Sequence, residues 1–114
     1  MADKEQQSGS TCAIPQEADY SGITIVELVP KTSPGDYMQA MELANREAQR
    51  QIGEHMLISW YDRDRDFESP QHSSECHAAS AIPGYVDYAL NHSAQLKIDI
   101  EHGRFVFFYL ALDL

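Results

Sequence analysis

The chain has 114 residues, enough for one domain with a core of its own. Its 18 acidic and 8 basic side chains give a net charge of −10 and a pI near 4.7. Such a surface repels phosphate backbones and anionic lipid headgroups, so we expect no nucleic-acid or membrane partner. The first residues, MADKEQQSGSTCA, hold no apolar signal core, and no segment has the ~20 apolar residues of a membrane span. We therefore expect a cytoplasmic protein.

The start of the chain predicts a flexible polar arm over residues 1–20, followed by a single α+β domain over residues 21–114. The arm is rich in Gln, Ser, Asp and Glu and shows no hydrophobic period. A first strand is predicted at Ile23–Val29 (ITIVELV). Apart from Thr24 and Glu27 it is apolar on both faces, which favours an inner strand of a sheet.

The next segment, KTSPGDYM, carries the signals of a helix start. Ser33 is suited to cap the helix, Pro34 to its first position, and Asp36 to the acid of a capping box. The helix is predicted to run to Ile52 and to end at Gly53, a residue that tolerates the backbone angles found beyond a helix.

Helical spacing separates two faces of this segment. The outer face carries polar side chains, among which Glu42 and Arg46 have the spacing of a favourable ion pair. The inner face is a single apolar stripe that predicts packing against a core: Tyr37, Met41, Ala44, Ala48 and Ile52.

The rest of the chain predicts a second strand at His55–Tyr61, a short helix near Pro83–Asn91 and two final strands. Leu96–Ile100 alternates apolar and polar residues, and a turn at Gly103 leads into Phe105–Leu112. The order is β-α-β-α-β-β. It predicts a two-layer α+β sandwich with two helices packed on one four-stranded sheet.

The last predicted strand, Phe105–Leu112, is apolar on both faces. Either it lies in the centre of the sheet, or something else covers its outer face. A second copy of the chain is one such cover, so we expect a homodimer through the C-terminal sheet.

The long connection after the second strand holds most of the residues suited to chemistry. Asp62, Asp64 and Asp66 have the spacing of the first ligands of a calcium loop. However, Phe67 stands where the loop needs glycine, and Ser73 where it needs glutamate. We interpret the Asp-Arg run as an exposed stretch of self-paired charges.

Farther along this connection lie His72, Cys76 and His77. Thiolate and imidazole suit zinc, but a structural zinc site needs a second ligand cluster, which the sequence lacks. We therefore predict no metal and no cofactor. Cys76 remains a candidate nucleophile, with His72 or His77 as its base.

The same region predicts a ligand site. If one of the two aromatics Trp60 and Tyr61 packs in the core, the other points outward and could form the floor of a pocket. The predicted ligand-binding residues are Trp60, Asp62, Arg63, Cys76 and Tyr85. We predict a module that binds a small molecule or a protein partner at the loop spanning residues 60–85. The alternatives are a small enzyme that depends on the Cys76 thiol or a metal, and a structural subunit of a larger complex.

The arrangement of segments resembles a known family. A long helix, MLISWYDRD, a loop with Pro and Cys, a Pro-Gly-Tyr helix and an LKIDI–G–FVFFY hairpin follow one another over about residues 23–112. This order is similar to that of a family of small uncharacterised prokaryotic proteins, classed as a domain of unknown function. The resemblance implies a compact α+β domain and no activity, and it assigns no catalytic residue.

The enzyme alternative makes a measurable prediction about Cys76. A thiol used as a nucleophile is alkylated quickly at neutral pH, because part of it is already thiolate. The alkylation rate should then fall as the pH drops through a depressed pKa. Ordinary thiol kinetics across this pH range would contradict the enzyme alternative.

Overall fold

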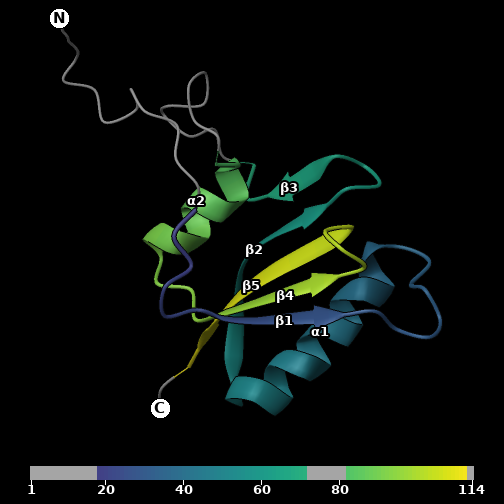
Figure 1. Cartoon of the computed structure of the whole chain (residues 1–114), viewed down its shortest axis with the longest axis horizontal. Coiled ribbons are helices and arrows are strands. Elements are labelled where there is room, and N and C mark those ends of the chain that lie inside the picture. The colour runs from purple at the N-terminus through teal and green to yellow at the C-terminus, as the bar shows by residue number, and fades with distance from the viewer. Residues whose placement is uncertain (1–17, 72–81, 113–114) are drawn as a thin grey trace, which may run out of the picture.

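A computed structural model of the chain describes residues 18–71 and 82–112 (Figure 1). The order of elements agrees with the prediction, with one short strand added. The elements are β1 (Thr24–Leu28), α1 (Tyr37–Ile52), β2 (His55–Asp62), β3 (Phe67–Ser69), α2 (Gly84–Asn91), β4 (Leu96–Ile100) and β5 (Phe105–Ala111). This part of the chain is therefore an α+β fold with two helices and one mixed sheet.

The sheet has the strand order β1-β4-β5-β2-β3. β1 is parallel to β4, and all other neighbours are antiparallel. β5 therefore lies in the centre, which accounts for its apolar sequence without a second copy of the chain. The prediction that the first strand is an inner one is wrong: β1 forms an edge, where the Ile25 side chain is 45% exposed.

The sheet has five strands, whereas four were predicted. The additional strand is β3. β3 follows a tight turn over residues 63–66, in which Asp66 has a φ of 50°, and it pairs with the end of β2. Three residues are too few to show an alternating pattern. The Asp-Arg run is thus the turn of a β-hairpin.

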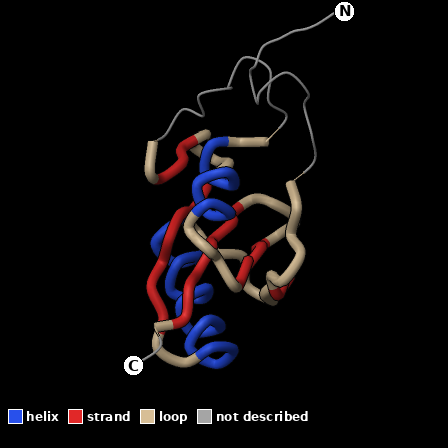
Figure 2. Tube along the Cα trace, turned by 90° about the vertical axis from the view of Figure 1, so that its left-hand side faces the viewer, coloured by secondary structure: helices blue, strands red, loops and turns tan. Residues whose placement is uncertain are grey.

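The two helices cover opposite faces of the sheet, so the predicted two-layer sandwich is wrong and the fold has three layers (Figures 1 and 2). Side chains alternate between the faces of a strand. In β5, Phe105, Phe107 and Tyr109 pack in the cluster under α1, whereas Val106 and Phe108 pack in the cluster under α2. The fold has three layers because β5 is apolar on both faces, and each face needs a helix packed against it.

The cap of α1 is Asp36, three residues later than the predicted cap at Ser33. The Asp36 carboxylate accepts a hydrogen bond from the Gln39 backbone N–H at 3.0 Å, and the Gln39 side chain accepts one from the Gly35 N–H at 2.7 Å. This pair resembles a capping box, except that the Gln39 side chain binds the N–H of the residue before the cap. The helix ends at Gly53 as predicted, where φ is 72°.

The inner face of α1 is built from small side chains. Ala40, Ala44 and Ala48 are fully buried against the sheet, one turn apart. Their lack of bulk lets the helix lie close to β4 and β5, whose larger side chains fill the layer between them. The predicted apolar stripe is confirmed, with Ala40 added to it.

Phe107 tests this core. The Phe107→Ala variant should lose about 3–5 kcal/mol of unfolding free energy in urea denaturation, because the side chain is fully buried at the centre of the sheet. Met38→Ala, on α1 with its side chain 57% exposed, should change stability by no more than about 0.5 kcal/mol. Equal losses in the two variants would contradict the position of β5.

Candidate binding site

The ends of β1, β2 and β4 lie along the same edge of the sheet, and we call this the carboxyl edge. Three connections meet there: the loop of residues 29–36, the turn of residues 63–66 and the turn of residues 101–104. In many α/β folds such an edge is where ligands bind. Three of the predicted site residues, Trp60, Asp62 and Arg63, lie on or beside it.

The guanidinium of Arg104 joins all three connections. It contacts Asp64 at 2.7 Å and Glu101 at 2.8 Å. It also donates to the Ser33 hydroxyl at 2.9 Å and to the Pro34 carbonyl at 3.1 Å. Hydrogen bonds from Arg104 hold the pKa of both carboxyls below their usual values. The Arg104 side chain thus ties the loops of this edge together.

The other two arginines of this edge and the buried Asp62 also have protein partners. The buried Asp62 carboxylate accepts from the Asp64 backbone N–H at 3.0 Å and from Arg65 at 2.6 Å. The Arg65 guanidinium lies 4.1 Å from the centre of the Tyr37 ring. Arg63 donates to a backbone carbonyl in the neighbouring turn at 3.3 Å. An incoming anion would have to displace these partners.

The two aromatics at the end of β2 pack on opposite faces of the sheet. Trp60 is half-buried under α1, in a cluster with Tyr37, Phe67 and Phe107. Tyr61 is half-buried on the α2 face and stacks on Tyr85 at 5.1 Å. The sheet therefore separates Trp60 from Tyr85, and the structure does not bring these two predicted ligand-binding residues together.

Tyr85 itself is buried and held at the start of α2. Its backbone N–H donates to the Glu68 carboxylate at 3.1 Å, and its carbonyl accepts from the Ser59 hydroxyl at 2.8 Å. Burial raises the pKa of its phenol well above the usual value. These contacts give Tyr85 a role in positioning α2.

The three remaining candidates, His72, Cys76 and His77, lie outside the described residues, and their roles stay predictions. Among residues 18–71 and 82–112, no group of three His, Cys, Asp or Glu side chains is placed to hold a metal ion. Neither helix in this part of the chain is long and apolar enough to cross a membrane.

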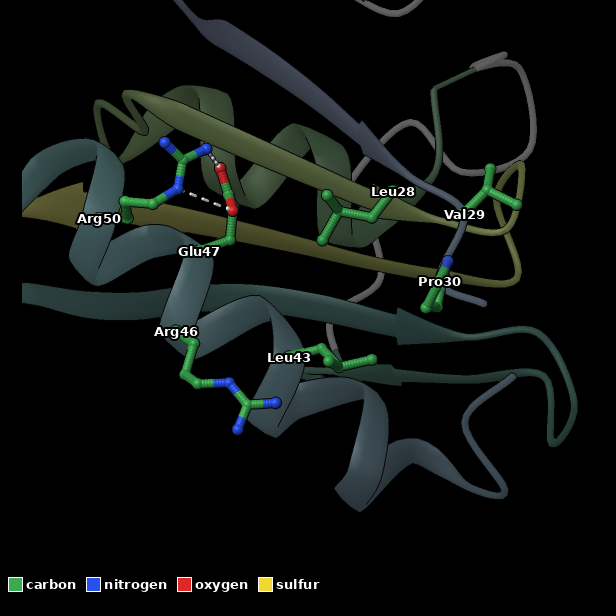
Figure 3. A pocket seen from close by; sticks show the side chains of 7 residues that line it. All are labelled: Leu28, Val29, Pro30, Leu43, Arg46, Glu47 and Arg50. Carbon is green, nitrogen blue, oxygen red and sulfur yellow. Dashed lines mark hydrogen bonds and ion pairs between the residues drawn. The ribbon is translucent and has the colours of Figure 1, made fainter. Parts of the chain in front are cut away.

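A cleft opens on the α1 side of the sheet, beside the edge strand (Figure 3). α1 lies over β4, β5 and β2, so β1 extends beyond the helix and leaves space between them. Its volume is about 340 Å³, at the small end of the range for small-molecule sites. The cleft is lined by Leu28, Val29, Pro30, Leu43, Arg46, Glu47 and Arg50.

Arg46 distinguishes this cleft from the carboxyl edge. The predicted ion pair between Glu42 and Arg46 is not formed; the pair on this part of α1 is Glu47 with Arg50 (Figure 3). Among the arginines that the structure describes, Arg46 alone makes no hydrogen bond, ion pair or ring contact within the described part of the chain. Two arginines and one glutamate leave the cleft lining with one net positive charge.

Sequence reasoning missed this cleft, because its residues come from two segments and are of common types. One signal was present. Leu43, Glu47 and Arg50 recur at helical spacing beside the buried stripe of alanines, which marks a second face of α1 that looks along the sheet.

Comparison with known proteins gives a family. A sequence model of a domain of unknown function, DUF5619, matches residues 23–109. The chain belongs to this family. The match confirms the resemblance predicted over residues 23–112, and it assigns no activity.

A solved structure has a similar fold. The crystal structure of a novel protein, AF1514 from Archeoglobus fulgidus DSM 4304, is similar with a TM-score of 0.64 and 20% sequence identity. The match covers 80% of this chain and 96% of that one. At this identity the likeness concerns the fold alone. No curated protein matches the chain.

The Arg104 network makes stability depend on pH. A carboxyl whose pKa is lowered in the folded state stabilises the fold above its unfolded-state value, here 3.8 for Asp64 and 4.5 for Glu101. This stabilisation is lost as the pH falls through the lower folded-state values. The unfolding free energy should therefore fall less steeply between about pH 5 and pH 3 in the Arg104→Gln variant than in the wild type.

The measurement is urea denaturation at a series of pH values. Arg46→Gln is the matched control, because it removes the same charge from α1, and Arg46 contacts neither Asp64 nor Glu101. The control should keep the steeper dependence of the wild type. If Arg104→Gln showed the same slope as the control, the network would have no part in acid stability.

Proposed function

We propose that this protein is a binding module that holds an anionic group joined to an apolar one in the cleft between β1 and α1. The observation that carries the proposal is Arg46, a guanidinium without a partner among the described residues, beside an apolar lining. Hydrogen bonds to a charged group contribute about 1.5–3 kcal/mol, more than neutral ones. A carboxylate would therefore be a favourable occupant.

The apolar lining of the cleft favours a ligand that also has an apolar part. Leu28, Val29, Pro30 and Leu43 present hydrocarbon to the cleft. Each Å² of apolar surface removed from water contributes roughly 25 cal/mol, so a short alkyl chain adds measurable affinity. A ligand that is only charged, or only apolar, would use one half of the site.

The site predicted from sequence, at residues 60–85, is a second location for the same function. The geometry supports it less well, because Arg63, Arg65 and Arg104 have protein partners there. Moreover, Trp60 and Tyr85 lie on opposite faces of the sheet. The two locations can be separated by experiment, since each carries its own arginine.

Heptanoate is a suitable probe for the cleft, with heptanamide as its uncharged counterpart. In two-dimensional NMR titrations of the full chain, heptanoate should shift the amides of β1 and of α1 around Leu43–Arg50. Heptanamide should bind about tenfold more weakly, because it lacks the charge that Arg46 contacts. The Arg46→Gln variant should lose this difference and bind both probes equally.

Arg63→Gln is the matched control, an arginine with the same charge at the carboxyl edge. It should bind heptanoate as the wild type does. Loss of heptanoate binding in Arg63→Gln, with shifts around Trp60, would instead place the site at residues 60–85. Equal binding of the two probes by the wild-type chain would contradict an anion site in the cleft.

A further inference from the structure

The outer edge of β1 presents backbone groups that no described strand pairs with. The Thr24 N–H donates to the Gln95 carbonyl at 3.0 Å, and the Leu28 carbonyl accepts from the Glu101 N–H at 2.9 Å. In a parallel ladder, alternate residues point their N–H and C=O groups to the same side. Thr24, Val26 and Leu28 therefore face β4, and the groups of Ile25, Glu27 and Val29 face outward.

The outer side of β1, which is distinct from the carboxyl edge defined above, adjoins the cleft. Three of the lining residues of α1, Leu43, Glu47 and Arg50, lie beside its buried stripe on the flank of the helix toward β1, and the exposed Arg46 side chain borders the cleft from the outer face of the helix (Figure 3). A strand placed against the edge of β1 would extend the sheet beneath that flank. Its side chains on the α1 face would then enter the cleft beside Leu28 and Leu43, at the side bordered by Arg46, whose guanidinium has no partner among the described residues.

We propose that the edge of β1 takes up an extended peptide segment of a partner protein as a sixth strand. The segment would carry apolar side chains for Leu28 and Leu43 and an acidic side chain for Arg46. Strand addition of this kind gains affinity from main-chain hydrogen bonds and specificity from alternate side chains. The inference rests on the proposed function and names the ligand class of the same cleft.

Glu27 is the reason to prefer a partner protein over a second copy of this chain. The outward-facing residues are Ile25, Glu27 and Val29, so Glu27 is their centre. Antiparallel pairing of two β1 edges about that centre would place Glu27 opposite Glu27, and like charges directly opposite destabilise a sheet. A foreign strand with lysine or arginine at that position would instead pair with it.

The exposed side chains along this edge also favour an occupant. Ile25 is 45% exposed and Val29 is 66% exposed. Natural edge strands are usually blunted by charges or bulges, which keep them from pairing indiscriminately. Among the outward-facing residues of β1, Glu27 favours an incoming strand that carries a positive charge opposite it. Ile25 and Val29 are β-branched and are well suited to strand pairing.

A library of random peptides of about ten residues, displayed on phage and selected against the full chain, tests the proposal. Recovered peptides should show a two-residue repeat. Every second residue, on the α1 face, should be apolar or acidic, and the residues between them should include a lysine or arginine opposite Glu27. Synthetic copies should bind Arg46→Gln about tenfold more weakly than wild type, because the charge-assisted contact is lost. Failure to enrich any such pattern would overturn the proposal.

Two substitutions of Glu27 isolate the backbone contacts. Glu27→Pro removes the central outward N–H and should abolish binding, since proline is tolerated at an edge but cannot donate. Glu27→Thr keeps the N–H and the strand preference, so its affinity for peptides selected without a cation opposite residue 27 should stay within about threefold of wild type. Peptides that bind both variants equally well would overturn strand addition.

Hydrogen exchange on the wild-type chain gives a readout that does not depend on how the variants fold. In the free protein the amides of Ile25 and Glu27 should exchange quickly, and those of Val26 and Leu28 slowly. Saturating peptide should slow the exchange of Ile25 and Glu27 by at least about tenfold. Unchanged exchange at these two amides would contradict a strand on this edge.

The heptanoate titration separates this inference from the function on which it rests. If heptanoate binds the cleft but no peptide is enriched, strand addition is wrong and the anion site stands. If peptides protect the β1 amides but bind Arg46→Gln as tightly as wild type, strand addition stands and the anion site is wrong. Protection that appears at high concentration of the chain alone would show a second copy on this edge, contrary to the proposal.

Discussion

The burial of β5 on both faces is the constraint on which the rest of the structure depends. Phe105–Tyr109 is a continuous run of large apolar residues, and all five are buried. A strand of this kind must lie in the middle of a sheet with cover above and below. α1 supplies one cover and α2 the other, and this requirement produces three layers. Because α1 centres on the middle strands, the outermost strand, β1, is left with an open flank.

Most local elements could be predicted, because their signals lie within short windows. The alternation of Leu96–Ile100 and the stripe of α1 identified those elements correctly. β3 has three residues and no period to find. The layering and the edge position of β1 depend on which strands pair across long distances in sequence, which periodicity does not encode. The β-branched residues of β1 suggested an inner strand, yet Ile25 is nearly half exposed.

The candidate site was harder to predict, for a different reason. Residue types drew attention to Asp62 and Arg63, but the structure gives these side chains partners within the protein. Availability, rather than type, separates Arg46 from the other described arginines. Spacing alone paired Arg46 with Glu42, whereas Glu47, the acid that lines the cleft, pairs with Arg50. Which of several ion pairs forms depends on side-chain rotamers and on neighbouring elements, and sequence spacing does not determine it.

The Arg104 network at the carboxyl edge and the cleft share the loop of residues 29–36. Val29 and Pro30, the first two residues of this loop, line the cleft, and Arg104 holds the other end of the loop through the Ser33 hydroxyl and the Pro34 carbonyl. The Leu28 carbonyl is also held, by the Glu101 N–H of the same turn. A site whose walls are fixed before the ligand arrives has less conformational entropy to lose on binding. If the cleft binds the proposed anion, the Arg104 network would add to the affinity by holding the walls of the cleft in place.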